Sequence, residues 1–295
     1  MCRLFGMTGG THEVQATFWL LDAATSLLLQ SETQPDGVGL GTFDADGTPS
    51  VYRKPVSANR SQTFIDGAHE VRSRTFLAHI RHATVAEPTL DNTHPFEQHG
   101  RLLAHNGVVG DIPELRRRLG SYTELIHGET DSEYYFTLIT KRIDEHGGDV
   151  SAGITAAARE LAADLALYSI NMVLTTPTEL WALRYPETNE LWILEHSIGG
   201  FDPGAGFDER SESGTMRVQA GELSFLRATV IASERMNANL GWRLLEPGEL
   251  IHVDSELRVT STMAVPDPPA HKIVLSEMTT REAIAQGEQP AAGTG

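Results

Sequence analysis

The only cysteine of this 295-residue chain is its second residue, and it opens a short apolar segment that predicts a buried strand over residues 2–8. If Met1 is removed, Cys2 carries its thiol and a free α-amino group on the same carbon. Both groups titrate near neutrality, with pKa values of about 8.5 and 7.7–8.0, so the amine can take the proton of the thiol. Only a terminal residue offers this chemistry. The alternative is that Cys2 is simply a small buried residue.

Composition and charge exclude several classes of protein. The chain has 23 basic and 40 acidic residues, and its net charge of −17 opposes non-specific binding to nucleic acid or to an anionic membrane. One cysteine cannot form an intramolecular disulfide, and no apolar run reaches the roughly 20 residues needed to cross a membrane. The N-terminus also lacks the basic and apolar regions of a signal peptide. We therefore expect a cytoplasmic protein with a reduced thiol and neither nucleic acid nor membrane as a partner.

Hydrophobic patterning predicts two groups of strands with helices around them. Short apolar segments bounded by turn residues predict strands before residue 110 and again after residue 170. Helical spacing covers residues 14–29, 130–145 and 151–167, and Thr130 with Glu133 has the pattern of a capping box. These elements indicate an α+β domain of residues 1–265 with largely antiparallel sheets. Residues 266–295, which end in Pro, Ala, Gly and Gln, predict a flexible C-terminal tail.

Three short sequences carry candidate functional residues, and each has a second interpretation. Arg81 at a strand end can bind a carboxylate through two parallel hydrogen bonds, or form a surface ion pair. Asp131 in the first turn of a helix can bind an amine, or only complement the helix dipole. Asn106 and Gly107 are typical of a type I′ hairpin turn, whose side-chain amide and backbone N–H can also face a developing oxyanion.

Other chemistries find less support in the sequence. Histidines 79, 82, 94, 99 and 105 raise the possibility of a metal hydrolase. However, His79 and His82 would face opposite sides of a continuing strand, and no His-Glu-x-x-His motif accompanies them. Gly37 and Gly39 are not followed by the Lys and Ser or Thr of a phosphate-binding loop, so close backbone packing is the better interpretation. We expect neither a metal nor another cofactor.

Read together, the motifs resemble one known family. The segments that carry the resemblance lie, in order, at residues 1–6, 37–39, 79–84, 92–96, 104–107 and 128–133, and with less force at residues 231–234 and 242–249. Each is short, but their order and the cysteine at position 2 are similar to the class II glutamine amidotransferase domain, which belongs to the N-terminal nucleophile hydrolases. The resemblance implies a four-layer αββα sandwich of two mainly antiparallel sheets.

The same resemblance implies a role for each candidate residue. Cys2 would be the nucleophile and its own amine the base, while Asn106 and Gly107 would form the oxyanion hole. Arg81 would bind the α-carboxylate of a glutamyl group and Asp131 its α-ammonium. Thr84 and His94 would line the pocket. The implied reaction passes through a thioester that water then hydrolyses.

Departures from the family pattern bear on the substrate. His82 stands where amidotransferases that feed a synthase usually have an aromatic residue, and Arg3 stands where they usually have glycine. No synthase, phosphoribosyl-binding or sugar-isomerase module follows in the sequence. The chain thus resembles stand-alone type 2 amidotransferase-like proteins, including the γ-glutamyl hydrolase of ergothioneine biosynthesis. We expect hydrolysis of a small-molecule γ-glutamyl amide, with two alternatives: a glutaminase subunit that passes ammonia to a separate synthase partner, and a non-catalytic binding protein.

Overall fold

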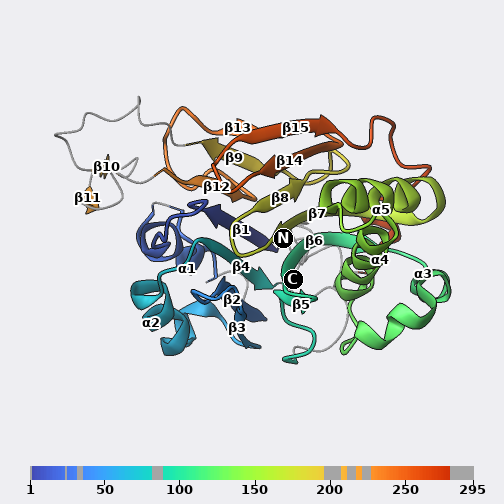
Figure 1. Cartoon of the computed structure of the whole chain (residues 1–295), viewed down its shortest axis with the longest axis horizontal. Helices are drawn as coiled ribbons and strands as arrows, with labels where there is room; N and C mark the ends of the chain where they lie inside the picture. Colours follow the sequence, from blue (N-terminus) through green and yellow to red (C-terminus); the bar gives the residue numbers. More distant parts are fainter. Residues whose placement is uncertain are drawn as a thin grey trace, which may run out of the picture.

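Two antiparallel β-sheets face each other and carry helices on their outer sides (Figure 1). The structure is a computed structural model, and it describes residues 2–23, 25–31, 36–81, 89–195, 207–210, 217–220 and 227–279. Within these ranges the strands of both sheets pair antiparallel, apart from one short parallel pairing. The expected α+β sandwich of two mainly antiparallel sheets is confirmed.

The first sheet contains the N-terminal strand at its centre. A strand with neighbours on both sides has its backbone groups paired along both edges, so this position holds the start of the chain firmly. In spatial order its strands are β13 (Arg243–Leu244), β9 (Trp192–Glu195), β12 (Thr229–Ala232), β1 (Arg3–Thr8), β4 (Thr75–Arg81), β2 (Gly37–Phe43) and β3 (Pro49–Lys54). A turn with Gly47 at a φ of 88° joins β2 to β3, as the Asp-Gly sequence predicts.

The second sheet is built around a long central pair, β6 and β7. In spatial order its strands are β15 (Val259–Met263), β14 (Glu249–Val253), β8 (Leu180–Leu183), β7 (Ala166–Thr175), β6 (Arg101–Val109) and β5 (Phe96–Gln98), and β16 (His271–Lys272) pairs in parallel with β7. β10 (Phe207–Arg210) and β11 (Arg217–Ala220) form a separate antiparallel pair. Because β1 contacts both β6 and β7, the start of the chain lies against the second sheet.

Three apolar cores hold the four layers together. The helices on the first sheet are the π-helical turn η1 (Phe18–Asp22), α1 (Leu27–Gln30), the 3-10 turn η2 (Ala58–Arg60) and α2 (Gln62–Glu70). Those on the second are α3 (Ile112–Leu119), the 3-10 turn η3 (Gly120–Leu125), α4 (Asp131–Glu145) and α5 (Val150–Asp164), and the 3-10 turn η5 (Leu275–Glu277) follows β16. Each helical layer buries one core against its sheet, and the third core lies between the sheets, where Leu4 and Leu77 meet Leu102 and Ala104.

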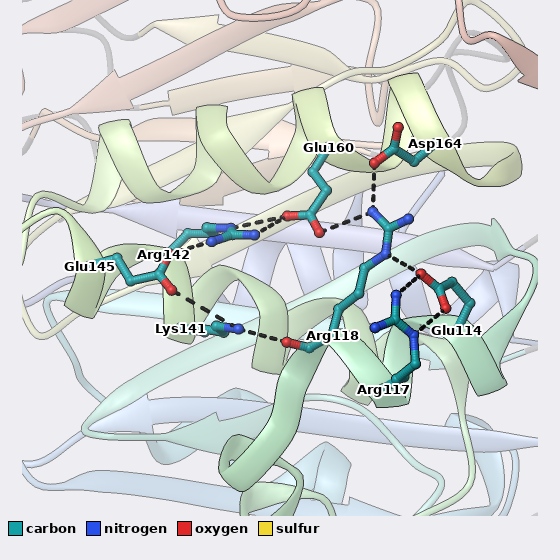
Figure 2. A network of polar contacts seen from close by, with 8 residues as sticks. All are labelled: Glu114, Arg117, Arg118, Lys141, Arg142, Glu145, Glu160 and Asp164. Atoms are coloured by element: carbon teal, nitrogen blue, oxygen red, sulfur yellow. Dashed lines mark hydrogen bonds and ion pairs between the residues drawn. The ribbon is translucent and has the colours of Figure 1, made fainter.

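The helices on the second sheet are also joined by a network of charged side chains (Figure 2). Arg118 of α3 lies 2.6 Å from Asp164 and 3.2 Å from Glu160, both on α5, and 2.8 Å from Glu114 one turn earlier. Arg142 of α4 binds the other oxygen of Glu160. Single surface ion pairs contribute little, but a network that ties three helices together contributes more. Arg118 is thus half-buried by these contacts.

The segment of residues 14–29 differs from its predicted single helix. Val14 exchanges backbone hydrogen bonds with Ser73, at 2.9 and 3.2 Å, so the segment begins in an extended conformation. A short π-helical turn follows, and Ser26 then caps α1 by accepting from the backbone N–H of Leu29. Val14, Leu20 and Leu27 are buried in the core of the first sheet nevertheless, and the partly buried Leu21 and Leu28 pack against it. The hydrophobic periodicity therefore predicts correctly that this segment packs against the sheet, but it predicts wrongly that the segment is one continuous helix.

The C-terminal segment continues to contact the domain beyond residue 265. The backbone N–H of Ala270 donates to the carbonyl oxygen of Ala162 at 2.8 Å, and that of Ile273 to Leu167 at 2.9 Å. The segment as far as residue 279 is therefore held against α5 and β7. Residues 280–295 lie outside the described residues, and for them the tail stays a prediction. Of the helices described, none is both long and apolar enough to cross a membrane.

Candidate active site

Cys2 lies immediately before β1, at the end of the strand that faces the middle of the molecule (Figure 1). It is half-buried, and its carbonyl oxygen accepts a hydrogen bond from the side-chain amide of Asn106 at 3.2 Å. Leu4, two residues further along β1, belongs to the core between the sheets. Because side chains alternate along a strand, Cys2 shares the face of β1 that points to the second sheet.

Arg81 ends β4, which pairs with β1. The register sets Arg3 opposite Ile80, so one further step brings Cys2 and Arg81 to the same end of the two strands. Arg81 shares a face of β4 with Leu77, which belongs to the core between the sheets. Its side chain is only 4% exposed. A guanidinium is thus held beside the start of the chain, on the face that Cys2 shares.

Asn106 and Gly107 lie within strand β6, and the predicted hairpin turn is wrong. Asn106 pairs with Asn171 and Gly107 with Ile170 in the ladder between β6 and β7. A Cβ atom on Gly107 would stand 1.7 Å from the carbonyl oxygen of Ser169, so the glycine permits a close approach of backbones rather than a turn. Asn106 itself is on the face toward the first sheet, where it meets Cys2.

Asp131 is the first residue of α4, and its carboxylate is bound to β6. One oxygen accepts from the backbone N–H of Val109 at 2.8 Å, and the other from that of Ser132 at 2.9 Å. The start of a helix favours an anion. Oδ1 also accepts from the hydroxyl of Ser132 at 3.5 Å, whereas Oδ2 keeps a further lone pair for a ligand. The carboxylate is therefore held against Val109, two residues beyond Gly107 on β6. Its remaining acceptor site can bind a cation.

The predicted capping box before α4 is wrong, because its two side chains have other roles. Thr130 occupies the N-cap position, but its hydroxyl makes no capping hydrogen bond. Glu133 instead accepts from the backbone N–H groups of His127 and Gly128, at 2.9 and 2.6 Å. It thereby holds the loop that delivers Asp131.

His94 lies in a cluster of buried rings beside Arg81. Its ring centroid is 4.1 Å from that of His79 and 4.6 Å from that of Phe96. Burial, with the positive charge of Arg81 as a second cause, lowers the pKa of His79 to about 3, and burial followed by the nearby His79 holds the pKa of His94 well below its usual value. Both imidazoles are therefore neutral at pH 7. Whether His94 also lines the pocket stays a prediction, and Thr84 lies outside the described residues.

The glycines of β2 explain how His94 reaches this position. A Cβ atom on Gly39 would stand 1.9 Å from the carbonyl oxygen of His94, and one on Gly41 would stand 2.9 Å from Pro95. The strand thus lacks side chains where the segment that carries His94 crosses it. The predicted role of these glycines in close backbone packing is confirmed.

Sequence reasoning missed two contributions to this region. The sequence indicates His105 only as a possible metal ligand, but its ring bonds Ser132 at 2.9 Å and so ties β6 to α4. The sequence predicts a flexible C-terminal segment, but Ile273 and Met278 line a cavity of about 280 Å³ beside Asp131. The sequence signal for this contribution of the C-terminal segment is the presence of apolar residues among its last 30 positions.

The layers and the central position of the first strand define a fold of the N-terminal nucleophile hydrolase type. The family model of the class-II glutamine amidotransferases matches residues 1–273. The chain belongs to this family. The Bacillus subtilis glutamine phosphoribosylpyrophosphate amidotransferase has a similar structure, with a TM-score of 0.63 and 19% identity over 90% of this chain and 50% of that chain. A predicted glutamine amidotransferase from Pseudomonas aeruginosa gives a TM-score of 0.58 and 20% identity over 88% of this chain and all of that one.

Curated relatives are similar over different shares of their length. The putative glutamine amidotransferase YafJ of Escherichia coli is 29% identical over 227 residues, which are 72% of this chain and 83% of the relative. The probable glutamine amidotransferase DUG3 of Saccharomyces cerevisiae is 27% identical over 170 residues, 50% of this chain and 47% of the relative. A glutamine–fructose-6-phosphate aminotransferase of Legionella pneumophila is 33% identical over 152 residues, which are 50% of this chain and 24% of that enzyme. The match thus spans about half of DUG3 and about a quarter of the aminotransferase.

Proposed function

We propose that this protein hydrolyses a γ-glutamyl amide, either glutamine or a γ-glutamyl conjugate, through a thioester on Cys2. The observation that carries the proposal is the contact between Asn106 and the carbonyl of Cys2, with Arg81 at the same end of the neighbouring strand. This arrangement brings a thiol, an amide donor and a guanidinium from two sheets to one place. Membership of the class-II glutamine amidotransferases supports the same chemistry.

The proposed substrate is oriented by its amino-acid end. Arg81 binds the α-carboxylate through its planar fork, and Asp131 accepts hydrogen bonds from the α-ammonium. Opposite charges at two fixed positions leave one orientation for the side chain of the glutamyl group, and its γ-carbonyl then lies over the thiol of Cys2. His79 and His94 are neutral and add no positive charge beside Arg81, so the guanidinium is the group that attracts the carboxylate at this strand end.

The reaction needs removal of Met1, which frees the α-amine of Cys2. The amine takes the thiol proton, and the sulfur attacks the γ-carbonyl carbon to give a tetrahedral oxyanion. The side-chain amide of Asn106 and the backbone N–H of Gly107 bind this oxyanion. The C–N bond then breaks, and the ammonium of Cys2 returns the proton to the departing amine. Water, deprotonated by the same amine, attacks the thioester and releases glutamate and the thiol.

A second candidate function is the delivery of ammonia to a synthase. It is favoured by the match to the Legionella pneumophila aminotransferase, of which this chain covers only 24%. Both functions use the same thioester, and they differ in the acceptor of the nitrogen. In either case we place the reaction in the cytoplasm, where the reducing environment keeps the thiol of Cys2 available.

Release of glutamate from a panel of amides tests the proposal. Glutamine, several γ-glutamyl amines and γ-glutamyl peptides are incubated with the protein and with its Cys2→Ala variant. We expect turnover of at least one compound and none above background for the variant. Turnover of γ-glutamyl conjugates in preference to glutamine would favour the hydrolase, and glutaminase activity that appears only with a partner chain would favour ammonia delivery. Equal turnover by Cys2→Ala would refute both.

A further inference from the structure

The two edges of β1 are held differently at the start of the chain. Toward β4 the backbone ladder extends to the pair Arg3 and Ile80. Toward β12 it ends earlier, at the pair Phe5 and Ala232. Chain ends fray unless they are tied down. The residues that come next on the β12 side therefore decide how firmly the first residues are held.

On that side a serine side chain continues the ladder. The backbone N–H of Leu4 donates to the hydroxyl of Ser233 at 2.7 Å, and the backbone N–H of Ser233 donates to the carbonyl oxygen of Leu4 at 3.1 Å. One further step in the same register sets Arg3 opposite Glu234. Their side chains form an ion pair at 3.5 Å and are 19% and 32% exposed. The ion pair is thus a cross-strand contact of the residue that adjoins Cys2.

We propose that Arg3 and Glu234 are positioning residues, which hold the start of β1 against the end of β12 so that the thiol and amine of Cys2 stay in place. This inference rests on the proposed function, because only a terminal nucleophile needs its own amine and thiol fixed together. Cys2 adjoins Arg3 covalently, and its carbonyl is held from the other sheet by Asn106. The ion pair restrains the same residue from within the first sheet.

The expected sizes of the effects on stability and on kcat distinguish a positioning role of Arg3 and Glu234 from a purely structural one. A half-exposed ion pair of this kind changes folding stability only slightly. A displacement of about 1 Å at a reacting group, in contrast, can slow a reaction about 100-fold. Loss of the pair should therefore lower kcat strongly while stability stays nearly unchanged. Substrate affinity should also stay nearly unchanged, because Arg81 and Asp131 belong to other strands and helices.

The test compares Arg3→Ala, Glu234→Ala and the charge-reversed double variant R3E/E234R. Loss of Met1 is first checked for each by intact mass. We expect kcat to fall about tenfold or more in the single variants with KM changed less than about threefold, and the double variant to recover most of the loss. The matched control is Arg258→Ala, which breaks the 3.4 Å ion pair with Asp254 on the turn next to Gly10, at the opposite end of β1. It should retain wild-type kinetics.

A second readout does not depend on the substrate. Cys2 is the only cysteine, so the rate of its alkylation by iodoacetamide is read directly from the mass of the protein. We expect slower alkylation across pH 6–9 in both single variants and recovery in the double variant. If the protein turned over no γ-glutamyl amide, the proposed function would be refuted. The alkylation rates would still show whether Arg3 and Glu234 position Cys2. Wild-type alkylation and kcat in the single variants, or a double variant no better than the singles, would overturn it.

Discussion

The side-chain amide of Asn106 donates a hydrogen bond to the carbonyl oxygen of Cys2, and this 3.2 Å contact joins the second sheet to the start of the first. The side-chain oxygen of Asn106, Oδ1, is buried and has no hydrogen-bond partner among the described residues. The amide is therefore oriented toward the cysteine by one contact only. Such a donor can turn toward an oxyanion without breaking a larger network.

Asn106→Ala removes this donor, and we predict that kcat falls about 10²- to 10³-fold while KM changes little. The reason is that the donor binds the oxyanion, which forms only after the substrate has bound. Steady-state kinetics with the best amide of the panel measure both constants. Asn59→Ala, at an exposed position on the outside of the first sheet, is the control. A rise in KM with an unchanged kcat would show that Asn106 contacts the ground state instead.

Asp131→Asn tests the binding of the α-ammonium. We predict that KM for glutamine rises about 10- to 100-fold, since a hydrogen bond to a charged group contributes about 1.5–3 kcal/mol. The matched substrate is glutaramate, which lacks the α-amino group, and its kcat/KM should be nearly the same in the variant and the wild type. If glutaramate lost as much as glutamine, Asp131 would act only through its hydrogen bonds to Val109 and Ser132.

His79 should make the stability of the fold sensitive to acid. Burial, with the charge of Arg81, lowers its pKa to about 3, whereas an unfolded chain has a histidine pKa of about 6.5. Between these values the unfolded state binds a proton that the native state does not. The free energy of unfolding therefore falls as the pH drops from about 6.5 toward 3, by about 1.4 kcal/mol per pH unit for this group.

Urea titrations at pH 7.5, 6.0 and 5.0 check this prediction. We expect His79→Gln to show a shallower decrease with acid than the wild type, whatever its stability at pH 7.5. His12→Gln, at an exposed turn, should keep the wild-type dependence on pH. If the free energy of unfolding of His79→Gln fell with acid as steeply as that of the wild type, the native imidazole would take up its proton over the same pH range as the unfolded one.

The sequence alone predicts the layers well and the ends of the main elements in part. The helix predicted to residue 167 ends at Asp164, because β7 begins at Ala166. The helix over Asp131–Glu145 ends where its pattern ends, and the strands before residue 110 and after residue 170 form the two sheets. Patterns of this kind report burial on one face, which the sheets and helices share along their whole length. Short elements such as β5 and β16 carry too few residues for a pattern, and they form only because a longer strand lies next to them.

Local motifs predict less well where a distant segment decides the structure. Asn-Gly favours a hairpin in isolation, but the backbone of Ser169 requires a residue without a Cβ atom at Gly107. Glu133 has the spacing of a capping box, yet it binds the loop before the helix. The pairing of Arg3 with Glu234 likewise depends on a register between segments more than 200 residues apart. The residues next to Arg3 and Glu234 in the sequence do not predict this pairing.

The central claim is that Cys2 is a terminal nucleophile in a site that recognises a glutamyl group. The most direct measurement is the intact mass of the purified protein before and after incubation with a diazo-ketone analogue of glutamine. We predict a protein that lacks Met1 and gains one adduct on Cys2, with glutamine slowing the labelling and Arg81→Ala nearly abolishing it. A protein that keeps Met1, or that labels at the same rate with and without glutamine, would contradict the account.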